Sequence, residues 1–399
     1  MRLLLKFFSA RFLFIDTAIM HKTYWYALAT LMGSIIGVGL FGLPYTAKVS
    51  GFWIVVAYFI VLTTLLVTLH LMYGELALQV KDHHQFPGYV ALFLGPRWKT
   101  AALISIFLGA NGGLLAYLIV GGQFLAQLAT PLFGGSLLLY QMIYYLAGAY
   151  LIYKGIQSVA KAEFVMFIVF MALVFILFVM SIFKLEVSHF ATLDLQHFFF
   201  PYGVIIFALW GVDSIPTLKE YLSRDARLLK KVIFHGVILS AITYLIFIIS
   251  ILGMSGSETS IDAVSGLLPY FSNNILSGAY LFGILTTFTS FIAIGLVLKK
   301  TFQSDYTMPH ELAWFLSLFP ALVLFSLGLN NFFMVISITG AVMLAFQGTL
   351  IALMYRKLTR QPHFKPQFKF TVPSTVVYAM ILILVSGIFT EIFLTLSRG

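Results

Sequence analysis

Residues 33–44 read Gly33-Ser34-Ile35-Ile36-Gly37-Val38-Gly39-Leu40-Phe41-Gly42-Leu43-Pro44 and lie inside an apolar run at 24–48. Four glycines and a proline within this stretch weaken a helix where a membrane would be thickest. The Gly33–Gly37 spacing alone would suit close packing of two helices, but packing does not require the further glycine at position 39. A bare backbone amide inside a bilayer costs several kcal/mol unless protein or a water-lined cavity satisfies it. We therefore expect a broken helix here, called the first break.

The composition of the chain supports a membrane setting. Of its 399 residues, 61% are hydrophobic and only 10% are charged, whereas soluble domains carry about 25% charged residues. So few charges cannot cover a soluble protein of this size, which excludes a soluble enzyme, a nucleic-acid-binding protein and a disordered scaffold. The chain has no cysteine, and this excludes disulfides, thiolate metal sites and thiol catalysis. A polytopic helical membrane protein remains.

Eleven apolar stretches are long enough to form transmembrane helices, because a core of about 30 Å needs about 20 helical residues. We place these spans at 24–48, 52–79, 99–130, 136–153, 160–183, 199–221, 230–253, 276–300, 311–329, 332–355 and 372–395.

The distribution of basic residues orients the spans. Of the 24 lysines and arginines, 21 lie in one set of alternate loops and only Lys48, Lys184 and Arg398 lie on the opposite face. Cytoplasmic loops carry the excess of basic residues. We therefore expect a protein of the cytoplasmic (inner) membrane with its N-terminus inside and, after an odd number of spans, its C-terminus outside.

The first 23 residues have basic residues ahead of an apolar run, as a signal peptide does. Asp16 interrupts that run, however, and no small-x-small cleavage site follows before the next span. We expect residues 1–23 to form a cytoplasmic segment that lies at the membrane interface.

A second broken helix is predicted in span six. The stretch 207–216 reads Phe-Ala-Leu-Trp-Gly-Val-Asp-Ser-Ile-Pro and combines Gly211, Pro216 and the carboxylate of Asp213. A carboxylate within a membrane is costly and marks a functional site by default. Asp213 is also a good residue to cap the half-helix that Pro216 begins, and one side chain can do both. We call this stretch the second break.

The two breaks lie in spans one and six, which are corresponding positions of two five-span halves. Interrupted helices in this arrangement point to an inverted-repeat transporter. We expect a first repeat at 24–183, a second at 199–355 and an additional eleventh span at 372–395. Half-helix N-termini can hold a carboxylate, and unwound carbonyls beside them can hold an ammonium group or a small cation. One pocket with both properties suits a zwitterion.

Several motifs resemble the amino acid–polyamine–organocation superfamily. The segment from Gly33 to Tyr45 resembles its first-helix motif, and the ending Gly42-Leu43-Pro44-Tyr45 is most similar to the amino acid/auxin permease and aromatic amino acid permease branches. The second break is similar to the motif Phe-Ala-Phe-x-Gly-Phe-(Glu/Asp)-Ser-Ile, with Asp213 in the acidic place and with departures at Trp210 and Val212. Tyr73-Gly74-Glu75-Leu76 and Pro87-Gly88-Tyr89 match the segment after span two, and the resemblance covers spans one to ten.

The resemblance implies an all-helical, LeuT-like fold that works by alternating access around a central amino acid site. Carried over position by position, it implies amides that hold the substrate carboxylate, carbonyls that face its ammonium group, an aromatic lid at position 207 and a tyrosine near the carboxylate. The implied substrate-binding residues are Ser34, Gly37, Val38, Gly39, Tyr117, Phe207, Trp210 and Asp213. Tyr117 has the alternative of simply packing between helices.

The resemblance leaves energy coupling open. Sodium-coupled relatives use hydroxyls on span eight, where Thr286, Thr287, Thr289 and Ser290 lie, but such hydroxyls also bond back to the preceding helical turn. Asp213, Glu75 and His70 are candidates for a proton relay, and the alternative for His70 is a hydrogen bond to a carbonyl between helices. Sodium coupling, proton coupling and uncoupled exchange all remain possible.

The sequence predicts a secondary active transporter of a neutral, aromatic or apolar L-amino acid, and not an enzyme. The alternatives are an exchanger or a transporter of cationic amino acids or polyamines with the same fold, and a receptor that senses an amino acid without moving it. We expect a small-molecule substrate, the lipid bilayer as the surroundings, a monomer or homodimer, no nucleic acid, no cofactor and no firm metal site.

Overall fold

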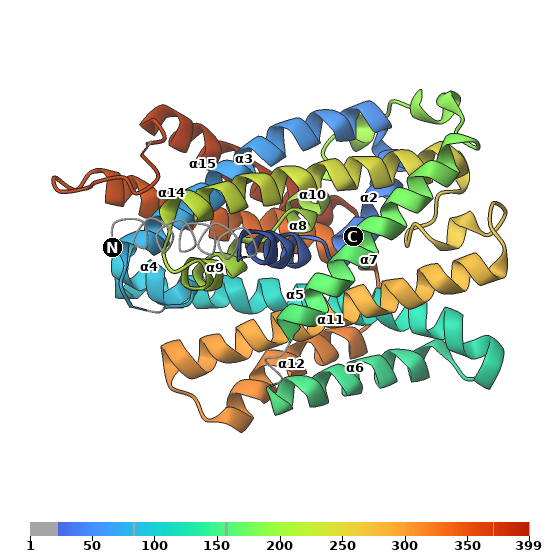
Figure 1. Cartoon of the computed structure of the whole chain (residues 1–399), viewed down its shortest axis with the longest axis horizontal. Helices are drawn as coiled ribbons and strands as arrows, with labels where there is room; N and C mark the ends of the chain where they lie inside the picture. Colours follow the sequence, from blue (N-terminus) through green and yellow to red (C-terminus); the bar gives the residue numbers. More distant parts are fainter. Residues whose placement is uncertain (1–22, 83, 156–158, 370, 399) are drawn as a thin grey trace, which may run out of the picture.

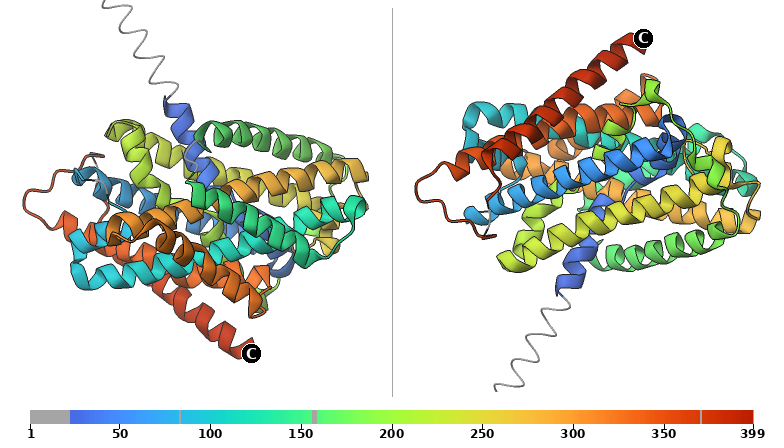
Figure 2. Two further views of the ribbon diagram at one scale, coloured as in Figure 1. Left: turned by 90° about the horizontal axis from the view of Figure 1, so that it is seen from below. Right: turned by 90° about the horizontal axis from the view of Figure 1, so that it is seen from above.

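The computed structural model describes residues 23–82, 84–155, 159–369 and 371–398. Within these ranges all regular elements are helices, and most run along the longest axis of the molecule (Figure 1, Figure 2). The N-terminal segment that was predicted to be interfacial lies outside the described residues, apart from Thr23.

Each predicted span coincides with helical structure. Span one is the helix Thr23–Ile35 followed by α2 (Gly39–Ser50). Span six comprises α8 (Pro201–Ala208), the 3₁₀ turn η3 (Val212–Ser214) and α9 (Ile215–Tyr221). Span ten comprises α13 (Phe332–Ile338), the π-helical η6 (Thr339–Leu344) and α14 (Ala345–Thr359). The remaining spans are α3 (Phe52–Gln79), α5 (Pro96–Phe133), α6 (Leu137–Lys154), α7 (Val159–Ile182), α10 (Ala226–Ser255), α11 (Asn273–Tyr306), α12 (His310–Ser326) and α15 (Ser374–Arg398).

Length and apolarity identify the membrane-crossing helices among the described residues. Seven helices are long and apolar enough to cross a membrane, and the bent pair in span one raises the number to eight. The stretch Phe167–Ile182 of α7 and the helix α12 are shorter apolar helices. The fold is that of a multi-pass helical membrane protein with interrupted first and sixth spans.

Two features of the fold differ from the sequence expectation. The segment between spans two and three, expected as a loop, contains the helix α4 (Phe86–Leu94), which has a proline in its first turn where no N–H bond is lost. Span ten, expected as one regular helix, contains the π-helical η6. Thr339 of η6 packs against Gly112 of α5, and Gly340 packs against the Gly203 carbonyl of α8 with no room for a side chain. A π segment of this kind is frequent at functional sites.

Basic side chains on the lysine-rich face cap the C-terminal ends of helices. Arg224 donates to the carbonyls of Leu78 and Val80 at 3.1 and 2.8 Å, at the end of α3. Lys299 donates to the carbonyls of Ile152 and Tyr153 at 2.9 and 3.1 Å, at the end of α6. Cations are favourable at helix C-termini, where carbonyls lack partners within the helix. These contacts fasten neighbouring spans together on the predicted cytoplasmic side.

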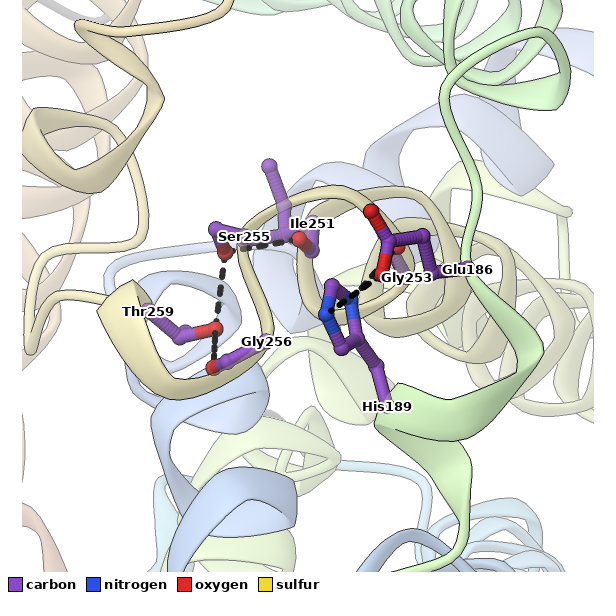
Figure 3. A network of polar contacts seen from close by, with 7 residues as sticks. All are labelled: Glu186, His189, Ile251, Gly253, Ser255, Gly256 and Thr259. Carbon is purple, nitrogen blue, oxygen red and sulfur yellow. Dashed lines mark hydrogen bonds and ion pairs between the residues drawn. The ribbon is translucent and has the colours of Figure 1, made fainter.

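The opposite face is held by contacts between two loops (Figure 3). His189, in η1 (Val187–Phe190), lies 2.9 Å from the Gly253 carbonyl and 3.5 Å from the Glu186 carboxylate. Beside it, the hydroxyls of Ser255 and Thr259 are 2.7 Å apart. The loop before α8 is thereby joined to the end of α10.

The two lysines on this face that the structure describes are fixed to the same region. Lys48 donates to the Thr259 carbonyl at 3.1 Å, and Lys184 donates to the Tyr270 carbonyl. The segment between α10 and α11 is therefore tied down from α2 and from the end of α7.

The orientation predicted from the basic residues can be tested with single cysteines, since the chain has no cysteine of its own. Ser188 and Gln361 are both exposed and lie in loops on opposite faces. We expect a membrane-impermeant maleimide to label Ser188→Cys in intact cells, and to label Gln361→Cys only after the membrane is opened. The reverse pattern would contradict the orientation, and the unsubstituted chain is the background control.

Candidate functional site

A cavity of about 650 Å³ connects the two breaks with the lysine-rich face. Its lining includes Gly37 and Phe207 at the breaks, and it follows α11 from Thr286 to Gln303, which is about 25 Å of helix. Lys299 and Lys300 also line it. In the predicted orientation the cavity is therefore open toward the cytoplasm.

Aromatic side chains fill the space between the breaks and the opposite face. The rings of Phe41 and Phe124 meet edge to face at 4.9 Å, and Phe247 and Tyr280 extend the cluster at 6.3 Å from Phe41 and 5.9 Å from Phe124. All four side chains are buried. This cluster closes the outer end of the path through the molecule.

The first break is short and closely packed. The chain leaves helical geometry over residues 36–38, and the flanking helices are bent by 54°. A Cβ atom added to Gly37 would clash with the Tyr117 hydroxyl, and one added to Gly39 would lie only 2.8 Å from the Ala208 Cα atom. Glycine is therefore required at both positions because another part of the protein occupies the space of a side chain.

Tyr117 of α5 connects the first break with α11. Its hydroxyl lies against Gly37 and faces the Val38 amide and the Ser290 hydroxyl. The structure thus places Tyr117 beside the first break. Ser34, Gly37, Gly39 and Tyr117 line the cavity, whereas Val38 is fully buried and does not.

The second break is supported from α3 by His70. α8 ends at Ala208, and helical structure resumes only at Val212. Within the gap, the Gly211 amide donates to His70 Nε2 at 3.2 Å, while His70 Nδ1 lies 2.7 Å from the Leu66 carbonyl. A carbonyl can only accept a hydrogen bond, so Nδ1 carries the proton and Nε2 is the acceptor. Both ring nitrogens are used, and His70 does not line the cavity.

Tyr244 of α10 joins the two breaks to each other. Its hydroxyl lies 2.8 Å from the Ile35 carbonyl and 2.9 Å from the Ala208 carbonyl. These are the last residues of the helices that precede the first and second breaks. Helix C-terminal carbonyls lack partners within the helix, and Tyr244 supplies a donor between both ends. Sequence reasoning missed Tyr244, because an isolated tyrosine in an apolar span gives no sign of what it faces.

Asp213 faces the cavity and not the end of a helix. The carboxylate lines the cavity together with Phe207 and Trp210, and the residues that the structure describes give it neither an ion pair nor a capping hydrogen bond to α9. The Trp210 indole N–H is buried, lies near Asp213 and makes no hydrogen bond in satisfactory geometry with any described residue. The Asp213 carboxylate and the Trp210 indole N–H thus both lie at the second break.

The hydroxyls of span eight do not all face the same way. Thr286, Thr289 and Ser290 line the cavity. Thr287 does not, and its hydroxyl donates to the Gly283 carbonyl at 2.7 Å, one turn back in α11. Thr289 also bonds back within α11, to the carbonyls of Leu285 and Thr286 at 3.1 Å. Three of the four candidate cation ligands therefore line the cavity, and Ser290 lies beside Tyr117 at the first break.

Glu75 lies outside the cavity as well. Its carboxylate accepts hydrogen bonds from the amides of Gln367 and Phe368 at 2.8 and 2.9 Å, and from Gln79 at 2.8 Å. This buried carboxylate holds the loop between α14 and α15 against α3. Within the described residues, no group of three or more His, Asp or Glu side chains is placed to hold a metal ion.

The contact between Gly37 and Tyr117 gives a testable prediction. We expect Gly37→Ala to lower substrate binding by about five- to 150-fold, since overpacking in a tight site costs about 1–3 kcal/mol. Removing the opposing hydroxyl in the double variant Gly37→Ala/Tyr117→Phe should restore part of the binding. The dissociation constant of the substrate, measured with each purified variant, tests the loss and its partial restoration. Gly278→Ala is the matched control, because a Cβ atom there meets nothing within 4 Å. Normal binding by Gly37→Ala would remove the first break from the site.

The position of Tyr244 gives a second prediction. Tyr244→Phe removes only the hydroxyl and leaves two buried carbonyls without their donor, which we expect to cost about 1–2 kcal/mol of stability. The variant should unfold at a lower temperature in detergent and should bind substrate more weakly. Tyr150→Phe is the control, since Tyr150 is 60% exposed on α6. Equal melting temperatures for both variants would contradict the bridging role.

Solved structures with the same overall fold are transporters. The chain matches the crystal structure of MhsT in complex with L-phenylalanine with a TM-score of 0.67 at 17% identity, over 91% of this chain and 98% of that one. It matches Mhp1, a nucleobase-cation-symport-1 family transporter, with a TM-score of 0.66 at 14% identity, over 92% and 91%. These likenesses show the LeuT-like fold that the family resemblance implied.

Sequence comparisons give the family. The chain is 23% identical to the tyrosine-specific transport system 1 of Haemophilus influenzae (strain ATCC 51907 / DSM 11121 / KW20 / Rd) over 304 residues, which are 71% of this chain and 74% of that protein. The model of the tryptophan/tyrosine permease family matches residues 20–394. The protein is thus a membrane transporter and not an enzyme, and it belongs to the tryptophan/tyrosine permease family.

Proposed function

We propose that this protein carries an aromatic L-amino acid across the cytoplasmic membrane by alternating access, within the amino acid–polyamine–organocation superfamily. The observation that supports this most is the cavity, which meets both broken helices at one end and reaches the lysine-rich face at the other. Its volume of about 650 Å³ falls in the range of small-ligand sites, about 300–1,000 Å³.

Polar groups for a zwitterion lie at the breaks. We assign the substrate carboxylate to the backbone of the first break near Gly37 and Gly39, beside Ser34, where the N-terminal end of α2 favours negative charge. We assign the ammonium group to the second break, where the Asp213 carboxylate and the chain around Phe207 and Trp210 face the cavity. Both assignments follow from charge: the N-terminal end of α2 attracts the substrate carboxylate, and the Asp213 carboxylate attracts the substrate ammonium group.

Apolar walls provide for the substrate side chain. Phe167 and Phe170 of α7, Ile106 of α5 and Ile294 of α11 line the cavity. An aromatic ring buries a large apolar area against such walls. The tyrosine-specific relative and the L-phenylalanine of the MhsT complex favour the same class of substrate.

Transport requires the outer end to open and the inner end to close. The described state is closed by the Phe41–Phe124 cluster and open toward Lys299. Because Tyr244 joins the ends of two half-helices, we propose that the helices of spans one and six move together with α10 and α3. Phe207, at the end of α8, would cover the bound substrate.

We propose that a cation gradient drives uptake. We assign sodium to the hydroxyls of Thr286, Thr289 and Ser290, of which Ser290 lies beside Tyr117 at the first break. We assign a proton to Asp213, the acidic side chain among the described residues that line the cavity. His70 is disfavoured as a proton relay because both of its ring nitrogens are bonded, and Glu75 because it lies outside the cavity.

The experiment is uptake by purified protein in liposomes. We expect labelled L-tyrosine, L-tryptophan or L-phenylalanine to accumulate several-fold under an imposed sodium or proton gradient, and L-lysine not to accumulate. Protein-free liposomes give the background. Because Asp213 also faces the ammonium group, Asp213→Asn should weaken accumulation under either gradient, and should abolish proton-driven accumulation even at raised substrate concentration, with the exposed Asp82→Asn as the matched control.

Other results would replace the proposal. Binding without uptake or counterflow would indicate a receptor. Counterflow that neither gradient increases would indicate an uncoupled exchanger, and preference for L-lysine would indicate a transporter of cationic substrates.

A further inference from the structure

Two arginines at the end of α14 meet one tyrosine of α15. Arg356 lies in the last turn of α14, and Arg360 follows the helix directly as its C-cap. The Arg356 Cζ atom lies 5.6 Å from the centroid of the Tyr378 ring, which is within the range of a cation–π interaction. The Arg360 Nη2 atom lies 3.5 Å from the Tyr378 hydroxyl oxygen. We call these three side chains the arginine–tyrosine cluster.

The cluster has two positive charges and no negative partner. Neither arginine forms an ion pair with a carboxylate in the part of the chain that the structure describes. Glu75 of the adjacent α3 accepts hydrogen bonds from two backbone amides of the loop after α14 instead. Arg356 is half-buried, and a partly desolvated charge is stabilised by a counter-charge. Arg360 and Tyr378 are exposed, so an anion from outside the protein can reach the cluster.

The cluster lies at the level of the lipid headgroups. Span ten runs from Phe332 to Thr359, which is 28 residues and about 42 Å of helix. A hydrocarbon core of about 30 Å cannot enclose both ends of this helix, and long arginine side chains at such an end extend to the interface. A tyrosine near the start of a crossing helix, such as Tyr378 in α15, is also typical of the interface. Because the end of α14 belongs to the lysine-rich face, the leaflet concerned is the cytoplasmic one in the predicted orientation.

An apolar stripe on α15 begins at this cluster and continues toward the opposite face of the membrane. Its members are each at least half exposed: Tyr378, Leu382, Phe389, Phe393 and Leu396. At about 100° per residue, these positions fall within about 60° of one another around the helix. Only 17% of the apolar window of α15 is buried, the smallest share among the described crossing helices, and α15 lies on the outside of the bundle (Figure 2). The stripe therefore faces the acyl chains of the bilayer.

The cluster and the stripe together match the two parts of a phospholipid. A guanidinium presents planar, paired N–H donors to phosphate oxygens, and the cluster offers two guanidinium groups. An anionic headgroup neutralises both, whereas a zwitterionic headgroup also brings an ammonium group that the arginines repel. Basic sites between membrane helices on the cytoplasmic side recognise anionic headgroups by this chemistry. The acyl chains continue from the headgroup along the stripe.

We propose that the arginine–tyrosine cluster binds the phosphate of an anionic phospholipid, and that this lipid fastens α15 to α14. The headgroup contacts Arg356 and Arg360 at the end of α14, and an acyl chain lies against Leu382 of α15, one turn after Tyr378. Since little of α15 is buried in the protein, the bound lipid adds to the stability of the folded state.

The test is a lipid titration of the purified, delipidated protein in detergent, with the melting temperature as the readout. A ligand that binds only the folded protein raises this temperature. We expect dioleoylphosphatidylglycerol to raise it at concentrations about tenfold lower than dioleoylphosphatidylcholine does. Glycerol 1-phosphate, which has the phosphate but no acyl chains, should have no effect at these concentrations.

Variants separate the cluster from the general charge of the face. The double variant Arg356→Gln/Arg360→Gln should need about 25-fold more dioleoylphosphatidylglycerol for half of the rise, because each arginine near an anionic surface contributes about fivefold to the affinity. The control Lys231→Gln/Lys365→Gln removes two exposed charges from the same face and should change this concentration by less than about twofold. Arg360→Gln alone should show a shift of about fivefold, and it serves if the double variant does not fold.

Three results would overturn the proposal. Equal effects of the two lipids would remove the selection for an anionic headgroup. Equal shifts in the arginine and lysine double variants would show a general attraction to the basic face and no site at the cluster. A rise with glycerol 1-phosphate that matches the rise with dioleoylphosphatidylglycerol would identify a site for free phosphate and not for a lipid.

Discussion

Backbone groups that leave a helix inside a membrane must find partners in the protein, and the architecture of this transporter depends on how that is done. The carbonyls of Ile35 and Ala208 share the Tyr244 hydroxyl, and the Gly211 amide is bound by His70. Because these partners come from α10 and α3, both breaks are held by helices other than their own. The interrupted helices are therefore stable only within the complete bundle. The cavity between the breaks exists because α10 and α3 supply the hydrogen bonds that the interrupted helices lack.

The breaks themselves could be predicted from the sequence because their cause is local. Glycine and proline weaken a helix wherever they stand, and a carboxylate such as Asp213 is conspicuous in an apolar span. Their partners could not be predicted, since Tyr244 and His70 are ordinary polar residues until packing decides what each one faces. His70 illustrates this, because the sequence offered it as a proton relay or as a partner of a carbonyl, and the structure bonds it to the Leu66 carbonyl and to the second break.

Other differences arise from rotation and from contacts between distant segments. Thr286 and Thr287 are adjacent in sequence, yet only Thr286 lines the cavity, because successive helical residues point about 100° apart. Glu75 bonds to a loop almost three hundred residues later, which no local pattern reveals. The π-helical η6 follows from close contacts with α5 and α8 at Gly112 and Gly203. Residue type and periodicity therefore predict the helices and their breaks. Which side chains line the cavity depends on how the faces of different helices pack together.

Lys48 and Lys184 have a consequence for how the protein is made. In the predicted orientation, each must be translocated across the membrane during insertion, against the tendency of basic residues to stay inside. Each then donates to a carbonyl of the segment between α10 and α11. These contacts form only after α10 and α11 have been inserted, since both acceptors belong to that segment. Two of the three exceptions to the charge asymmetry thus link spans one and five to the segment after span seven, and they stabilise the outer face only once biosynthesis has passed the middle of the chain.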